Sequence, residues 1–450
     1  MARRRHRRVA RVPRLRTQVR PHNSDRGADS AEVADLDNRP AARDKRELRH
    51  VKSPAMVHGQ LRSARISAAV AFAVQGFFLA VVLTQLPQIR DRYGFGEGLV
   101  VGVVVLISLL AGVGSVVAER IALKRSSRVT LRAGLALIAV TGLGIALAPG
   151  PIALFIALAG YGIALGIVDA STNMQAVAIQ HGYGTIILSS FYAAWSAGAI
   201  VGALYVSVCS AINVSLQVSV VIAAILVAIV GAGAGRYLLE ARTGAPTPLG
   251  HTVVAIPTRI FVALGVAMAL FFAIDLAIGN WSALYLDDVL SADAATAALG
   301  LAAYQGAALL SRLTGDLWVR RFGEVAVIRG GGALGVLGML IVVLAPNPAV
   351  AIAGFLVVGL GVPLVAPLCF STLGHLTSGP GLDAAVARLN IFNYAGTLIG
   401  GGVVGAIAVG TSLRVGFVVP LIFAGLLIML APVFAAQQRT RVDSASINHG

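Results

Sequence analysis

The chain has 450 residues, of which 57% are hydrophobic and only 12% are charged. A soluble domain carries about twice that share of charge, roughly a quarter of its residues. The composition therefore excludes an ordinary soluble protein and predicts a polytopic membrane protein. A net charge of +16 would suggest a nucleic-acid partner in a soluble chain, but in this chain the excess lies in an N-terminal arginine series and in short loops between apolar segments. We expect no nucleic-acid partner.

Residues 1–62 are polar, rich in arginine and without helical periodicity, and we expect a disordered cytoplasmic tail there. Its arginines could bind acidic lipid headgroups. A translation start at Met56 is an open alternative. No signal peptide is predicted, because the first apolar segment is a full-length span without a small-residue cleavage site.

Apolar segments of about 20 residues, the length that crosses a bilayer core, lie on both sides of a polar central loop at 236–259. Such unbroken runs exclude a transmembrane barrel, whose strands would alternate over about ten residues. The predicted spans are 66–86, 98–121, 129–148, 151–177, 186–210 and 214–235, then 260–286, 294–317, 325–345, 349–373, 384–409 and 413–436. The fold class is thus an all-α membrane protein with twelve transmembrane helices in two six-helix lobes, 63–235 and 260–437, followed by a tail at 438–450.

The charges of the loops orient these spans. Basic residues gather after the second and eighth spans, in the central loop and in the C-terminal tail, whereas loops on the opposite side hold Asp287, Asp288 and Asp293. The positive-inside rule then predicts that both termini are cytoplasmic. Arg90 and Arg92 are exceptions, partly balanced by nearby acids.

The two halves resemble each other at the end of their second helix. Glu119 and Arg120 end the second span, and Arg320 and Arg321 end the eighth. Short basic turns of this kind can hold neighbouring helix ends together and re-form as two lobes rock. We therefore propose a cytoplasmic gate whose candidate residues are Glu119, Arg120, Arg312, Asp316 and Arg321.

With twelve spans split six and six, the segment Ser115–Lys124 resembles the loop 2–3 motif of the major facilitator superfamily, Gly-x-x-x-Asp-Arg-x-Gly-Arg-Arg, although it is degenerate at both glycines. Three further stretches, 166–176 with 190–198, 280–286 and 312–316, are similar to the YbjJ-like branch, which is near the fucose permeases. The similarity runs over nearly the whole membrane portion. It implies an alternating-access transporter with its substrate site between the lobes.

The chain departs from the branch pattern at two positions. Tyr192 stands where a histidine is common, and Asn280 stands where an acid is common. Any proton-coupling role that those groups have in relatives is therefore in doubt for this chain. The Gly-Pro run typical of drug antiporters is also missing from the fifth span, which disfavours an antiporter for apolar drugs.

Ionisable residues inside spans are costly and indicate function by default. Asp169 shares a helix face with Asn173, four residues on, and could bind a proton or a polar substrate. Asp275 lies near the midplane and could carry a proton. For each aspartate, a structural contact is the competing explanation.

Several polar and aromatic side chains near mid-depth complete the candidate site. Amides donate and accept hydrogen bonds, which suits a hydroxylated or zwitterionic solute, and aromatic rings could stack on a sugar or form a lid; interhelical bonding and core packing are the alternatives. The substrate- or proton-binding candidates are Asp169, Asn173, Asp275, Gln75, Trp195, Asn280, Trp281, Gln305, Asn390 and Asn393. Arg312 and Asp316, four residues apart, are expected to pair with each other or with loop 8–9.

No arrangement of residues indicates catalysis. The chain lacks a phosphate-binding Gly-rich Lys-Ser/Thr loop, its histidines lack metal-ligand spacing, and Cys209 and Cys369 lie inside apolar segments. We expect no enzyme activity, no cofactor and no metal. The predicted function is secondary transport of a small polar solute with protons by a monomer in the cell membrane. Proton-driven efflux and a non-transporting membrane sensor remain the alternatives.

Overall fold

In the part of the chain that the computed structural model describes, residues 54–95, 97–240, 256–377 and 380–435, every regular element is a helix. The chain divides into two units, Met1–Met56 and Val57–Gly450, and the two-lobed fold belongs to the second. Most of the expected N-terminal tail, central loop and C-terminal tail lies outside the described residues. The first helix begins at Pro54, inside the range 1–62 that was expected to form the N-terminal tail.

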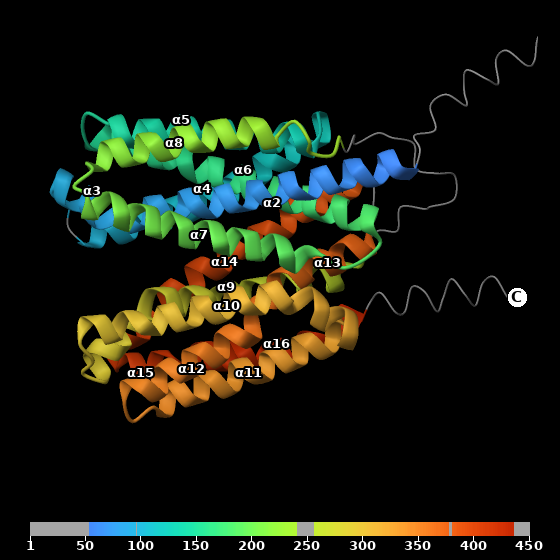
Figure 1. The fold of residues 1–450 in the computed structure, drawn as a ribbon. Helices are drawn as coiled ribbons and strands as arrows, with labels where there is room; N and C mark the ends of the chain where they lie inside the picture. The colour runs from blue at the N-terminus through green and yellow to red at the C-terminus, as the bar shows by residue number, and fades with distance from the viewer. Residues whose placement is uncertain (1–53, 96, 241–255, 378–379, 436–450) are drawn as a thin grey trace, which may run out of the picture. The chain divides into compact units, whose positions relative to one another are not determined.

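Between Pro54 and Ala234, the described residues of the N-terminal lobe form six long helices and one short one (Figure 1). Ser126 and Ser215 accept hydrogen bonds from the first turns of two of them, and Pro151 begins a third, so the ends follow ordinary capping chemistry. The helices are α2 (Pro54–Thr84), α3 (Leu86–Tyr93), α4 (Glu97–Lys124), α5 (Ser127–Leu147), α6 (Pro151–Tyr183), α7 (Leu188–Ala211) and α8 (Leu216–Ala234).

The C-terminal lobe repeats this plan with three interrupted spans. The predicted tenth span breaks at Val362–Leu364, beside Pro363, because a proline cannot donate the backbone hydrogen bond that continues a helix. The elements are α9 (Thr258–Leu284) with η2 (Tyr285–Val289), α10 (Ala294–Phe322), α11 (Glu324–Leu344), α12 (Pro348–Gly361) with η3 (Val362–Leu364) and α13 (Val365–Leu376), α14 (Pro380–Gly410), α15 (Leu413–Gly416), and α16 (Val418–Leu430) with η4 (Ala431–Ala435).

Within the described residues, eleven helical segments are long and apolar enough to cross a membrane. The remaining long helix, α10, supplies the twelfth predicted span. It contains Arg312, Asp316, Arg320 and Arg321, which lower its hydropathy. The all-helical fold with two six-helix lobes is confirmed.

Glycines allow the same pair of helices to approach closely in each lobe. A side chain at Gly198 of α7 would collide with the backbone of Ala73 on α2, and one at Gly400 of α14 would collide with the backbone of Ala273 on α9. These are the first and fifth spans of each half. Close backbone contact through small residues is how helices associate in lipid, so the internal repeat extends to helix packing.

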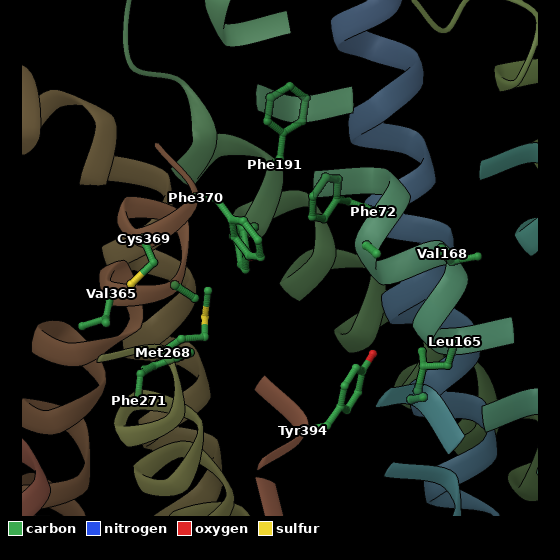
Figure 2. Packing of buried hydrophobic residues seen from close by; sticks show 14 of the residues in the cluster. Phe72, Leu165, Val168, Phe191, Met268, Phe271, Val365, Cys369, Phe370 and Tyr394 are labelled. Carbon is green, nitrogen blue, oxygen red and sulfur yellow. The ribbon is translucent and has the colours of Figure 1, made fainter. Parts of the chain in front are cut away.

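The lobes meet along α4, α6 and α7 on one side and α10, α13 and α14 on the other (Figure 1). Figure 2 shows buried side chains of both lobes in one cluster, among them Phe72 and Phe191 of the N-terminal lobe and Phe370 of the C-terminal lobe. We call the end of the helices that carries Arg120, Lys124, Arg320 and Arg321 the basic side. The opposite side carries α3 and α15.

Candidate functional site

A cavity of about 180 Å³ lies between the lobes. Its charged lining residues are Asp169 on α6, Asp275 on α9 and Arg312 on α10, and the rest of its wall is mainly aromatic, aliphatic and amide. From these residues it extends away from the basic side, along Leu79 and Leu83 of α2. The other lining residues are Phe72, Gln75, Val104, Ile107, Ser108, Leu165, Tyr192, Trp195, Phe272, Leu276, Asn393, Tyr394 and Thr397.

Asp169 is the centre of a hydrogen-bond cluster that joins the lobes. Its Oδ1 accepts a bond from Gln75 of α2 at 3.2 Å. Its Oδ2 accepts bonds from Asn390 at 3.0 Å, Asn393 at 3.0 Å and the Tyr394 hydroxyl at 2.9 Å, all on α14. One carboxylate of the N-terminal lobe therefore binds three donors of the C-terminal lobe.

Close packing holds α6, which carries Asp169, against α4, and α4 in turn contacts α14. Gly166, one turn earlier on α6, lies against the backbone of Ala111 on α4, where a side chain would not fit. On α4, Ser115 accepts a second hydrogen bond from Asn390 at 3.0 Å. Ser115 occupies the first glycine position of the loop 2–3 motif, so this departure supplies an interlobe contact.

Asn173 does not share this cluster. Its Nδ2 donates to the backbone oxygen of Asp169 at 2.9 Å, and its Oδ1 accepts from the Tyr192 hydroxyl at 3.0 Å. These bonds stay within the N-terminal lobe. Tyr192, rather than Asn173, lines the cavity.

Asp275 and Arg312 occupy the opposite wall of the cavity. The Tyr304 hydroxyl donates to Asp275 Oδ1 at 2.7 Å. Arg312 Nη1 donates to Ser196 Oγ on α7 at 2.6 Å, and its guanidinium lies 6.0 Å from the centre of the Trp195 ring. Arg312 is only 4% exposed, so its charge is held inside the protein.

Arg312 and Asp316, which were expected to pair with each other or with loop 8–9, form no ion pair with each other. Asp316 accepts bonds from the backbone N–H groups of Ser189 at 3.0 Å and Ser190 at 3.1 Å, in the first turn of α7. Backbone N–H groups at a helix start have no partner within the helix and favour a nearby negative charge, so they compete with Arg312 for this carboxylate. Asp316 therefore joins the lobes at the basic side, and Arg312 is left to line the cavity.

The remaining mid-depth candidates divide into two groups. Gln75, Trp195, Asn390 and Asn393 lie in the cavity wall or in the Asp169 cluster. Trp281 donates to the backbone of Gly401 at 3.2 Å, and Asn280 lies beside the same glycine, so both contact α14 outside the cavity. Gln305 is not among the residues that line it.

Contacts between the lobes close the basic side. Arg388 of α14 donates to Glu119 Oε1 at 2.7 Å, Gln180 donates to Ser371 at 2.9 Å, and His181 contacts the backbone oxygen of Gly374 at 2.6 Å. Every interlobe side-chain hydrogen bond between described residues lies at the level of Asp169 or nearer the basic side. Of the gate candidates, Glu119, Arg312 and Asp316 bridge the lobes, whereas Arg120 and Arg321 are exposed.

Sequence reasoning missed Arg388 and Tyr304. Arg388 lies inside a predicted span, so the rule that flags intramembrane charge could have found it. Tyr304 gave no such signal, because a tyrosine in an apolar helix is ordinary packing until its partner is known. Within the described residues, no group of three His, Cys, Asp or Glu side chains could hold a metal ion.

Comparison with known proteins places this fold in a family. Residues 14–202 match the model of the Major Facilitator Superfamily. An uncharacterized transporter of Sinorhizobium fredii is 30% identical over 66% of this chain and 78% of its own length. An uncharacterized MFS-type transporter of Yersinia pestis is 29% identical over 79% of this chain and 91% of its own length.

Solved structures share the architecture at low identity. FucP, a transporter described in the outward conformation, gives a TM-score of 0.68 at 16% identity and covers 82% of this chain and 98% of its own. The proton:xylose symporter XylE gives 0.63 at 13% identity, over 83% of this chain and 95% of its own. At such identities the likeness concerns the fold alone.

Proposed function

Because the chain belongs to the Major Facilitator Superfamily, we propose that it is a secondary transporter that moves a small polar solute together with protons by alternating access. The solute site is the cavity between the lobes, and Asp169 is the proton carrier. FucP is described as a fucose:proton symporter and XylE as a proton:xylose symporter. Those descriptions concern the relatives, and they favour proton coupling as the hypothesis for this chain.

The observation that carries the proposal is the position of Asp169 across the lobe interface. Bonds to a charged acceptor contribute about 1.5–3 kcal/mol each, against about 1 kcal/mol for neutral pairs. Protonation of Asp169 removes its charge and so weakens its three bonds to α14 together. A proton on this carboxyl would then lower the free-energy cost of separating the lobes.

The surroundings of Asp169 also suit its protonated form. Gln75 Oε1 is buried and has no hydrogen-bond partner, although Gln75 Nε2 donates to Asp169. An amide offers a donor at one end and an acceptor at the other. Rotation of the Gln75 amide by half a turn would present an acceptor to a protonated Asp169, so the same neighbour can bind both protonation states.

The closure of the basic side indicates which state of the cycle the structure resembles. The cavity extends from Asp169 and Arg312 away from that side. If the basic side faces the cytoplasm, as the loop charges predict, the cavity faces outward. The proposed location is then the cell membrane, with solute and protons entering from outside.

Transport in proteoliposomes tests the proposal. Purified protein would be assayed for solute uptake with and without an inward proton gradient, against sugars, amino acids and organic cations, with Asp169→Asn and Asp275→Asn alongside. We expect the gradient to drive accumulation of a solute by the wild type and not by Asp169→Asn. Asp288→Asn, at an exposed position, is the matched control.

Three results would count against the proposal. Accumulation by Asp169→Asn with unchanged proton dependence would remove Asp169 as the carrier. Proton-driven export in place of uptake would replace symport by efflux. Absence of any flux over the panel would favour the sensor alternative.

A further inference from the structure

We infer that the solute is a small zwitterion whose carboxylate binds Arg312 and whose ammonium group binds Asp275; this inference rests on the proposed transport function. Three charged side chains line the cavity, Asp169, Asp275 and Arg312. They differ in how many of their hydrogen-bonding positions other protein groups already occupy. That difference identifies which of them are available to a ligand.

Asp169 has little capacity left for a ligand. Its two oxygens accept four hydrogen bonds, one from Gln75 and three from α14. A carboxylate offers about four acceptor positions, so the cluster fills them. A cationic solute would have to displace those donors to reach this carboxylate.

Arg312, in contrast, has unused donors. Nη1 bonds to Ser196, and Nε is buried without a partner. Nη2 forms no hydrogen bond to any described residue, and Arg312 lines the cavity. No carboxylate of the described residues lies within ion-pair distance of this guanidinium. A buried cation with unsatisfied donors is costly unless something pairs with it, and a guanidinium matches a carboxylate in shape and charge.

Asp275 is the complementary half of the site. Its Oδ1 accepts from Tyr304, but its Oδ2 has no hydrogen-bond partner among the described residues and is not sealed from the cavity. Its charge interacts with that of Arg312 without the two forming an ion pair. The cavity is therefore lined by a cation and an anion that are not paired with each other. Each has a hydrogen-bonding atom that no described residue uses.

Complementarity decides among solute classes. A neutral sugar would offer neither charge an ionic partner, and a simple acid or amine would match one and repel the other. A zwitterion matches both and adds no net charge to the cavity. The proton on Asp169 would then be the only charge that moves in a transport step. Trp195 and Phe272 supply an apolar wall for the solute's side chain.

Thermal stabilisation of the purified protein by ligands tests this assignment. The probes are the common L-amino acids and, for any that stabilises, its analogues without the amino group or without the carboxylate: for serine, glycerate and ethanolamine. Sugars and glycerol serve as neutral probes. We expect an amino acid to raise Tm, and each analogue to bind at least about tenfold more weakly, because one charge-assisted contact is lost.

Variants identify the partners of the two charges. Arg312→Gln should abolish stabilisation by the zwitterion. Asp275→Asn should weaken that stabilisation to the level that the analogue without the amino group gives in the wild type. The exposed controls Arg329→Gln and Asp288→Asn should bind like the wild type. Stabilisation that survives in Arg312→Gln would overturn the assignment.

Uptake of the same probes separates this inference from the transport function. Proton-driven uptake of a sugar, with no response to any zwitterion, would overturn the solute class and leave the transport proposal standing. Absence of both binding and flux for every probe would overturn both.

Discussion

The Tyr394 hydroxyl on α14 donates a 2.9 Å hydrogen bond to Asp169 on α6, and this bond crosses the boundary between the lobes. Alternating access requires the lobes to separate and re-form their contacts on either side of the site. A carboxylate at this boundary couples its own protonation to the cost of that movement. Changes to the contacts around it should therefore alter gating, stability or coupling in measurable ways.

Breaking the contact between Glu119 and Arg388 should loosen the basic side. The Arg388 side chain is 62% exposed, so the ion pair contributes about 1 kcal/mol or less to the free energy that keeps the basic side closed. Arg388→Gln should therefore raise the population open at the basic side by about fivefold or less. Labelling of a cysteine at Ser190, in a background without Cys209 and Cys369, measures that opening.

A double variant in which the two charges are exchanged provides the control for this contact. The double variant Glu119→Arg with Arg388→Glu should return labelling toward the original rate. Equal labelling in the single variant and the unaltered background would mean that this pair does not hold the gate.

Replacing Asp316 should destabilise the protein more than replacing an exposed acid does. Asp316→Ala removes two bonds to the first turn of α7 and leaves backbone N–H groups buried without acceptors. The cost should be about 1–3 kcal/mol. Thermal unfolding in detergent measures it, with Asp288→Ala as the exposed control; the same Tm for both variants would refute the capping role.

A single methyl group at Gly198 should separate α2 from α7. The added carbon would meet the backbone oxygen of Ala73, which cannot move without shifting a helix. Gly198→Ala should cost about 1–3 kcal/mol or more. Gly233→Ala is the matched control, because nothing lies within contact distance of its added carbon; equal Tm values would contradict the close packing of these two helices.

The orientation of the membrane protein is testable in intact cells. Asp288 and Arg321 are exposed and lie on opposite sides, and each would be replaced by a single cysteine in a background without Cys209 and Cys369. A membrane-impermeant thiol reagent should label the Asp288→Cys variant and spare Arg321→Cys until the cells are opened. The reverse pattern would place the termini outside and invert the proposed direction of the cavity.

Much of this architecture could be predicted from the sequence because it follows from local properties. Runs of apolar residues indicated the spans, and the break in the tenth lies at Pro363, where a proline removes a backbone donor. Asp169 stood out because a charge inside a span is costly. Partner choice could not be derived in that way. The spacing of Arg312 and Asp316 favours a pair on an isolated helix, but α7 offers unsatisfied N–H groups to the acid and a hydroxyl to the arginine. Such competition depends on the neighbouring lobe, which single-helix spacing does not describe.

The most direct test of proton coupling through Asp169 measures two activities of the Asp169→Asn variant, solute exchange without a gradient and accumulation driven by a proton gradient. Proteoliposomes loaded with unlabelled solute would be assayed for entry of labelled solute without a gradient, and empty ones for uptake driven by a proton gradient. We expect exchange to persist, because an amide mimics the protonated carboxyl, while gradient-driven accumulation is lost. Accumulation at the wild-type level would contradict proton coupling through this carboxyl.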